Sequence, residues 1–236
     1  NTAVGKDALT ANTTGTRNTA LGYSAGAAVT TSNDNTAVGY NSLLVSTGSG
    51  NCAIGAYALD ANTTANYNVA VGYNALTKTT TGAEHVAIGS FALNEMLTGE
   101  ACVAIGDNAL RLNLGSINTA VGYQSMDACT TGTSMVAVGR ASLGAVTTGS
   151  GHVGVGQDAL GTVTTGTNST AVGHQALKAS TGANNVAVGY QAGVAVSTGT
   201  NNVAVGSYAL DANTTASNNT AVGYQALTAN TTGTVN

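Results

Sequence analysis

Hydrophobic and polar positions follow one another in a fixed order along the whole chain. Three small or aliphatic residues precede a glycine, as in Thr2-Ala3-Val4-Gly5, and a second apolar pair follows, as in Ala8-Leu9. Short runs of β-branched residues bounded by glycine are typical of strands. The few residues between glycines and Thr pairs leave no room for a stable helix. We therefore predict two short strands and two turns in each unit.

The glycine after the first segment recurs at intervals of 16 or 17 residues. A unit of this length is shorter than the roughly 33–47 residues of a helical-hairpin repeat, and it fits one coil of a solenoid. We predict an all-β fold, a parallel β-solenoid of 14 coils that spans 1–236 as a single uninterrupted array. Solenoids normally end in atypical capping repeats, and this array has none, so we expect it to be an excerpt of a longer chain.

The repeat glycines are predicted to be structural turn residues, because a bend there would need positive φ or the absence of a Cβ. They are Gly5, Gly22, Gly39, Gly55, Gly72, Gly89, Gly106, Gly122, Gly139, Gly156, Gly173, Gly189, Gly206 and Gly223. Three units are one residue shorter between a leucine and the Thr-Gly turn, as from Leu43 to Gly48. A loop can shorten in this way, whereas the loss of a strand residue would turn its side chains to the opposite face.

The residues on the first segment alternate between a Val/Ile column and an Ala column, which point to opposite sides of a strand. The Ala column either fits a narrow part of the same coil or forms an outward strip of methyl groups that another backbone approaches. We favour the outward strip. The expected partner is another copy of the chain around a rotation axis, giving a homotrimeric fibre.

Asparagine opens most units, four residues before the repeat glycine. Stacked Asn side chains can hydrogen-bond along a ladder and hold a turn together. The predicted structural Asn ladder comprises Asn1, Asn18, Asn35, Asn51, Asn68, Asn118, Asn185, Asn202 and Asn219.

Tyrosine recurs directly after the repeat glycine and forms a possible surface-binding stripe. Its members are Tyr23, Tyr40, Tyr73, Tyr123, Tyr190 and Tyr224. Tyrosine is a frequent recognition residue, and with its Asn, Gln and Thr neighbours it could stack on sugars. Alternatively, stacked Tyr side chains cover the edge of the coil or fill a groove between subunits, which we favour.

The residues that break the repeat offer no catalytic, metal or cofactor site. His85 and Cys102 follow one another in the Asn column, but two ligands do not make a zinc site, which needs three or four. Cys52, Cys102 and Cys129 are scattered and odd in number, which argues against a disulfide framework. The ten acidic residues are dispersed, whereas a polysaccharide lyase or hydrolase would need an acidic cluster on one face. We expect no enzyme activity.

Composition narrows the remaining functions. Only 7% of the residues are charged and the net charge is −4, so there is no basic footprint for nucleic acid. No apolar run approaches the roughly 20 residues that cross a bilayer. Abundant threonine raises ice binding as an alternative function. The threonines of each pair are adjacent, however, so they would point to opposite sides of a strand, which argues against an ice-binding surface.

The segment Asn219–Gly233 closely resembles the repeat arrays of phage and bacterial tail-fibre-domain proteins. The cores Ala87-Ile88-Gly89 and Ala104-Ile105-Gly106 resemble the YadA-like head repeat of trimeric autotransporter adhesins, although the adhesin repeat is shorter. These resemblances imply a left-handed parallel β-roll that forms trimers and binds host or matrix surfaces. We therefore expect an extracellular, structural and adhesive fibre segment on a cell or virion surface, with a carbohydrate-binding module as the alternative.

Overall fold

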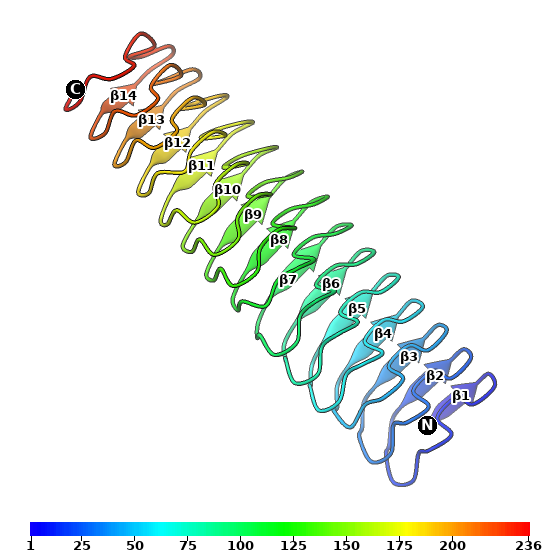
Figure 1. The fold of residues 1–236 in the computed structure, drawn as a ribbon. Coiled ribbons are helices and arrows are strands. Elements are labelled where there is room, and N and C mark those ends of the chain that lie inside the picture. The colour runs from blue at the N-terminus through cyan, green and yellow to red at the C-terminus, as the bar shows by residue number, and fades with distance from the viewer. The chain divides into compact units, whose positions relative to one another are not determined.

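The computed structural model describes all residues 1–236, which divide into two compact units, Asn1–Ile117 and Asn118–Asn236. Each unit contains seven short strands and no helix, and the strands are labelled in Figure 1. The first unit holds β1 (Thr2–Val4), β2 (Thr19–Leu21), β3 (Thr36–Val38), β4 (Cys52–Ile54), β5 (Val69–Val71), β6 (Val86–Ile88) and β7 (Val103–Ile105). The second unit holds β8 (Thr119–Val121), β9 (Val136–Val138), β10 (Val153–Val155), β11 (Thr170–Val172), β12 (Val186–Val188), β13 (Val203–Val205) and β14 (Thr220–Val222).

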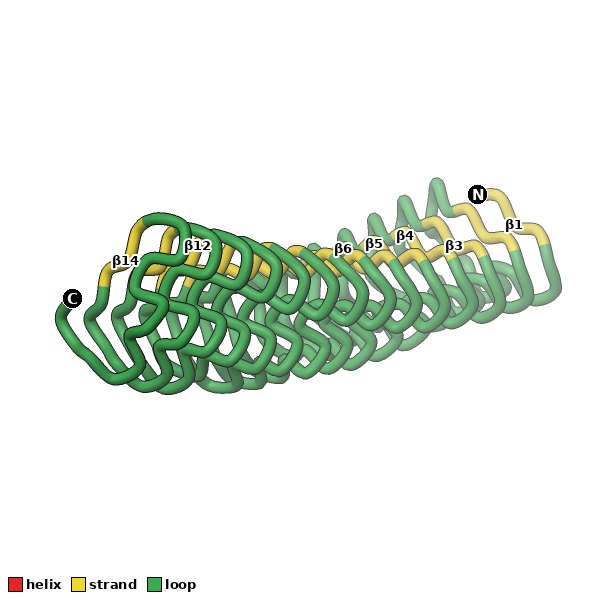
Figure 2. The backbone as a smooth tube through the Cα atoms, turned by 90° about the horizontal axis from the view of Figure 1, so that it is seen from above, coloured by secondary structure: helices red, strands yellow, loops and turns green.

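Consecutive strands within each unit pair in parallel and place equivalent residues of neighbouring coils opposite one another. In β2 and β3, for example, Ala20 lies opposite Ala37. Each unit is therefore a parallel β-solenoid, as the repeat predicts. Figure 2 shows that the strands follow one side of the coils, whereas loops and turns make up the rest of the circumference.

The shorter units keep the same strand register as the longer ones. Thr36 pairs with Cys52, 16 residues on, and Thr170 pairs with Val186 at the same interval. The missing residue comes from the Thr-Gly corner, where the amides of Thr13, Thr14 and Gly15 all donate to the carbonyl of Thr30. Because several amides share one acceptor, this corner can lose a residue without disturbing the strands.

The prediction of a second strand in each unit is wrong. The residues that follow the repeat glycine form turns, and the second and fourth residues after it have positive φ, as in Asn74 (φ 53) and Leu76 (φ 52). A strand requires negative φ at both positions. Backbone hydrogen bonds still join the coils here, because the amide of Leu76 donates to the carbonyl of Ala92.

The Ala column lines the interior of each coil, which contradicts the expected outward strip of methyl groups. Ala70, Ala87 and Ala137 are fully buried. The leucines of the turn column, such as Leu76 and Leu143, are also fully buried. A Cβ at Gly154, the one glycine of the Ala column, would lie 3.3 Å from Leu143 of the preceding coil. The bend at the repeat glycine leaves a narrow interior, and small side chains at the strand centre make room for the leucines.

Candidate functional site

The outward side of each unit is a flat surface that we call the strand face. It consists of the residues one and three positions before each repeat glycine, because the central residue of every three-residue strand points inward. The first kind is always aliphatic, and Ile54, Ile88 and Val138 are 40%, 38% and 37% exposed. The second kind is Thr or Val except for Cys52. The face therefore presents a continuous double column of apolar and threonine side chains through seven coils of each unit.

An aromatic ladder runs beside the strand face, on the first or second residue after the repeat glycines. In the first unit, consecutive ring contacts join Tyr23, Tyr40, Tyr57, Tyr73 and Phe91, with centroids 5.3–6.2 Å apart. In the second unit, contacts of 5.3–6.4 Å join His174, Tyr190, Tyr208 and Tyr224. Five of the six predicted stripe residues have ring partners: Tyr23, Tyr40, Tyr73 and Tyr190 are 44–49% exposed, and Tyr224 is 71% exposed.

Two tyrosines lie outside this ladder. Tyr123 belongs to the predicted stripe, is 49% exposed and makes no ring contact, since the next coil carries Arg140 and Ala141 beside it. Tyr67 lies at another corner and is 67% exposed. Its ring covers the backbone of Gly50, where a Cβ would approach the ring to 2.7 Å. The rings of the aromatic ladder contact one another, whereas the ring of Tyr123 has no aromatic partner.

The predicted Asn ladder links the coils through side chain to backbone hydrogen bonds. Asn18 Oδ1 accepts the amide of Asn35 at 3.0 Å, and its Nδ2 donates to the carbonyl of Ser32 at 2.8 Å. The same pair of bonds recurs at Asn51 and Asn202, and the side chains are buried. Each Asn thus satisfies one buried donor of the next coil and one buried acceptor of its own turn.

Two histidines replace asparagine in this ladder and reproduce its bonds. His85 Nδ1 accepts the amide of Cys102 at 3.2 Å, and Nε2 faces the carbonyl of Gly99 at 2.9 Å. This pattern requires a neutral ring with its proton on Nε2. Burial lowers the pKa of His85 from 6.5 to about 4. Burial also lowers the pKa of His152, whose Nδ1 accepts the amide of Ser169.

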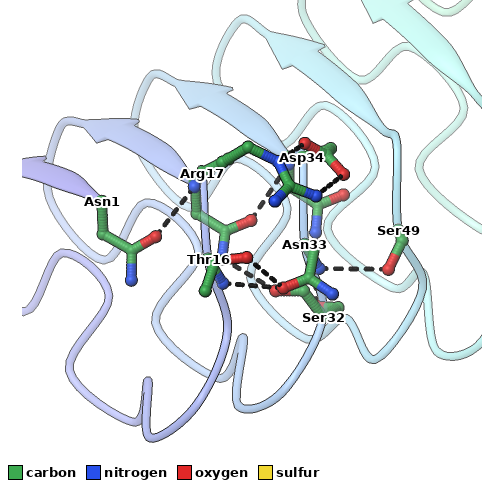
Figure 3. A network of polar contacts seen from close by, with 9 residues as sticks. Asn1, Thr16, Arg17, Ser32, Asn33, Asp34 and Ser49 are labelled. Atoms are coloured by element: carbon green, nitrogen blue, oxygen red, sulfur yellow. Dashed lines mark hydrogen bonds and ion pairs between the residues drawn. The ribbon is translucent and has the colours of Figure 1, made fainter.

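Sequence reasoning missed two further polar columns. The first lies seven residues after the repeat glycine, where Asn62 is buried and bonds to both the amide and the carbonyl of Ala65. The second lies two residues before the ladder Asn, where Asn33 Oδ1 accepts the amide of Thr16 and Ser49 Oγ accepts the amide of Asn33 (Figure 3). The recurrence of Asn in Ala-Asn-Thr-Thr was the available signal for the first column.

Charged side chains stay at the surface of the coils. Arg17 and Asp34 form a two-pronged ion pair with N–O distances of 2.5 and 2.8 Å (Figure 3). The hydrogen bond to Arg17 holds the pKa of Asp34 below its ordinary value. Both side chains are at least half exposed, so the pair adds little stability.

The repeat glycines have the positive φ that the sequence predicts for a bend. Gly72 has φ +136, and a Cβ there would lie 2.6 Å from the carbonyl oxygen of Gly89. Both the torsion and the close approach of the next coil therefore require glycine.

The cysteines, acidic residues and Thr pairs do not converge on a single site. Cys102 takes the place of an asparagine in the Asn ladder, Cys129 is buried and Cys52 lies on the strand face. No group of three His, Cys, Asp or Glu side chains has the arrangement of a metal site. In the Thr pairs, hydroxyls such as Thr63 Oγ1 donate to the carbonyl of the next coil, here that of Thr80 at 2.9 Å. The structure contains no helical segment with the length and hydropathy of a membrane span.

No protein-family model, curated protein or solved structure matches the chain.

Proposed function

We propose that this chain is a structural and adhesive segment of an extracellular fibre, on a cell or virion surface, and that copies of it associate through the strand face. The observation that carries the proposal is the strand face itself, with Val and Ile side chains about two-fifths exposed in coil after coil. Contiguous exposed apolar patches beyond roughly 300–600 Å² mark interaction surfaces on soluble proteins. The resemblance to tail-fibre and YadA-like repeats favours a left-handed β-roll and three copies.

The contact between copies would be made by side chains larger than the alanines expected from the sequence. Strands β5, β6 and β9 each direct one Val or Ile and one further Val outward, at positions 69 and 71, 86 and 88, and 136 and 138. Burying this surface against another copy would supply the hydrophobic stabilisation that the single chain leaves unused. No charged residue interrupts the face, so no desolvation of a charge opposes the contact.

A segment built this way would act mechanically. Within each unit, strand pairing joins every coil to the next, the Asn ladder adds hydrogen bonds between many of the coils, and equivalent side chains recur from coil to coil. A surface of that kind offers many equal, weak sites, so binding would depend on avidity rather than on one tight site.

The mass of the chain in solution tests self-association directly. Light scattering should give about three times 22.9 kDa for the native protein. Ile88→Lys and Val138→Lys place a charge on the strand face and should shift the mass towards 22.9 kDa. Thr81→Lys and Thr148→Lys, at exposed corners away from the face, are the matched controls and should leave the mass unchanged. A native mass of 22.9 kDa would refute the association.

Carbohydrate binding remains a second candidate, and one observation favours it. Tyr123 is half exposed, makes no ring contact and is followed by Gln124, so its ring can stack on a sugar beside an amide donor. Tyr73 already contacts Tyr57 and Phe91. If the segment binds glycans, Tyr123→Ala should abolish binding on a glycan array, whereas Tyr73→Ala should weaken it less. A blank array with the native chain would exclude this candidate.

A further inference from the structure

Tyr23 and Tyr40 form a parallel pair of phenols on neighbouring coils. Their ring centroids are 5.3 Å apart and their planes differ by 12°. The other Tyr–Tyr contacts are edge to face, with interplanar angles of 70–83°. The second parallel pair joins His174 to Tyr190 and contains one phenol. Tyr23 and Tyr40 are therefore the one contacting pair of tyrosines whose ring planes are nearly parallel.

The surroundings leave this pair open to a reagent. Tyr23 and Tyr40 are 44% and 46% exposed. On the opposite side of Tyr23, the ammonium group of Lys6 lies 5.5 Å from the ring centroid. Tyr23 thus has Tyr40 as its single aromatic neighbour, whereas Tyr40 also contacts Tyr57 edge to face.

We propose that Tyr23 and Tyr40 are a site of oxidative cross-linking, at which a haem peroxidase with hydrogen peroxide converts the two phenols to dityrosine. Each phenol loses one electron and one proton to give a phenoxyl radical, and the two radicals join through the ring carbons next to their hydroxyls. The two carbon-bound hydrogens then move to the oxygens and restore both phenols. One peroxide is reduced to two waters, and the protein loses two hydrogens.

Orientation decides which pair reacts. Carbon–carbon coupling requires the two carbons ortho to the hydroxyls to approach each other. Two nearly parallel rings from the same column, with centroids 5.3 Å apart, can bring these carbons together by small side-chain rotations. An edge-to-face pair directs one ring edge at the other ring centre, which separates the ortho carbons. The product would be a covalent link between β2 and β3 at their outer side, added to the hydrogen bonds that already join these coils.

The product can be located by cleavage before aspartate. This cleavage releases fragment 7–33, in which Tyr23 is the single tyrosine, and fragment 34–59, which holds Tyr40 and Tyr57. After peroxidase treatment of the full chain, mass spectrometry should find these two fragments joined with the loss of two hydrogens, together with dityrosine fluorescence. A mixture of ¹⁵N-labelled and unlabelled protein should give joined fragments of a single isotope, because both residues belong to one chain.

Two matched variants separate the pair from its neighbours. Tyr40→Phe keeps the ring, as Phe91 does elsewhere in the ladder, and should abolish the joined fragments. Tyr57→Phe should leave their yield unchanged. Joined fragments that survive in Tyr40→Phe, mixed-isotope products or no joined fragments in the native chain would each overturn the proposal. These outcomes do not depend on self-association through the strand face.

Discussion

His85 occupies the place of an asparagine and makes the same two bonds. Its Nδ1 accepts the amide of Cys102 at 3.2 Å, just as Asn68 Oδ1 accepts the amide of His85 at 2.9 Å one coil earlier. The two nitrogens of a neutral imidazole therefore replace the oxygen and nitrogen of a carboxamide. An imidazolium could not, because both of its nitrogens are donors.

We predict that His85 makes the stability of the protein dependent on acid pH. The pKa of His85 is about 4 in the folded chain against an ordinary 6.5, so the unfolded chain binds more protons between these values. The contribution of His85 to the free energy of unfolding is complete above about pH 7 and falls as the pH drops from 6.5 to 4. Below pH 4 the total loss is about 3 kcal/mol. Urea unfolding across this range should show the loss. His85→Asn should remove the part that His85 contributes and leave the part from His152, whose pKa burial also lowers. An equal pH dependence in the variant would contradict the assignment.

Removal of a ladder asparagine should destabilise the solenoid strongly. Asn68→Ala leaves the amide of His85 and the carbonyl of Gly82 buried without partners, which should cost about 2–5 kcal/mol in urea unfolding. Asn66→Ala is the matched control. It removes the hydrogen bond that the amide of Ser49 donates to Asn66 Oδ1, but alanine occurs at the equivalent Ala83, so the expected cost is about 1 kcal/mol or less. If both variants lost the same free energy of unfolding, the Asn ladder would contribute no more to stability than the column of Asn66.

The buried leucines test the positive φ of their column. Leu76→Ala should cost about 2–5 kcal/mol through the cavity that it leaves. Leu76→Gly removes the same side chain and also the Cβ that makes the left-handed torsion of φ 52 unfavourable, so it should be more stable than the alanine variant by about 0.5–1 kcal/mol. At Val146, which is buried at negative φ, glycine should be less stable than alanine. If the alanine and glycine variants ranked in the same order of stability at both sites, the positive φ of Leu76 would be contradicted.

The repeat glycines should tolerate no side chain. Gly72→Ala combines φ +136 with a Cβ 2.6 Å from the oxygen of Gly89, and we expect a loss of about 3 kcal/mol or more in thermal or urea unfolding. Gly144→Ala serves as the control, because Gly144 has ordinary φ and other coils carry Thr10 or Ala27 at that column. A mild effect at Gly72 would mean that neighbouring coils can separate at the bend.

Much of the architecture followed from periodicity alone. Repetition of Thr-Ala-Val-Gly at 16 or 17 residues predicts parallel strands in register, and a missing residue beside the Thr-Gly turn predicts an intact register in the shorter units. The second strand could not be judged in this way, since Ala-Leu after a glycine suits a strand and a turn equally. In the structure, Asn74 and Leu76 have positive φ, so this segment forms a turn instead of a strand.

The amino-acid sequence by itself determined the repeat, its glycine bends and the columns in which equivalent residues stack, because each of these depends on spacing along one chain. Only the tertiary structure decided which side of the strand points inward. Alternation separates Ala70 from Val71 but does not say which belongs to the interior. The narrow coil resolves it: the small Ala70 is buried in the interior that the leucines also occupy, and Val69 and Val71 are left on the strand face.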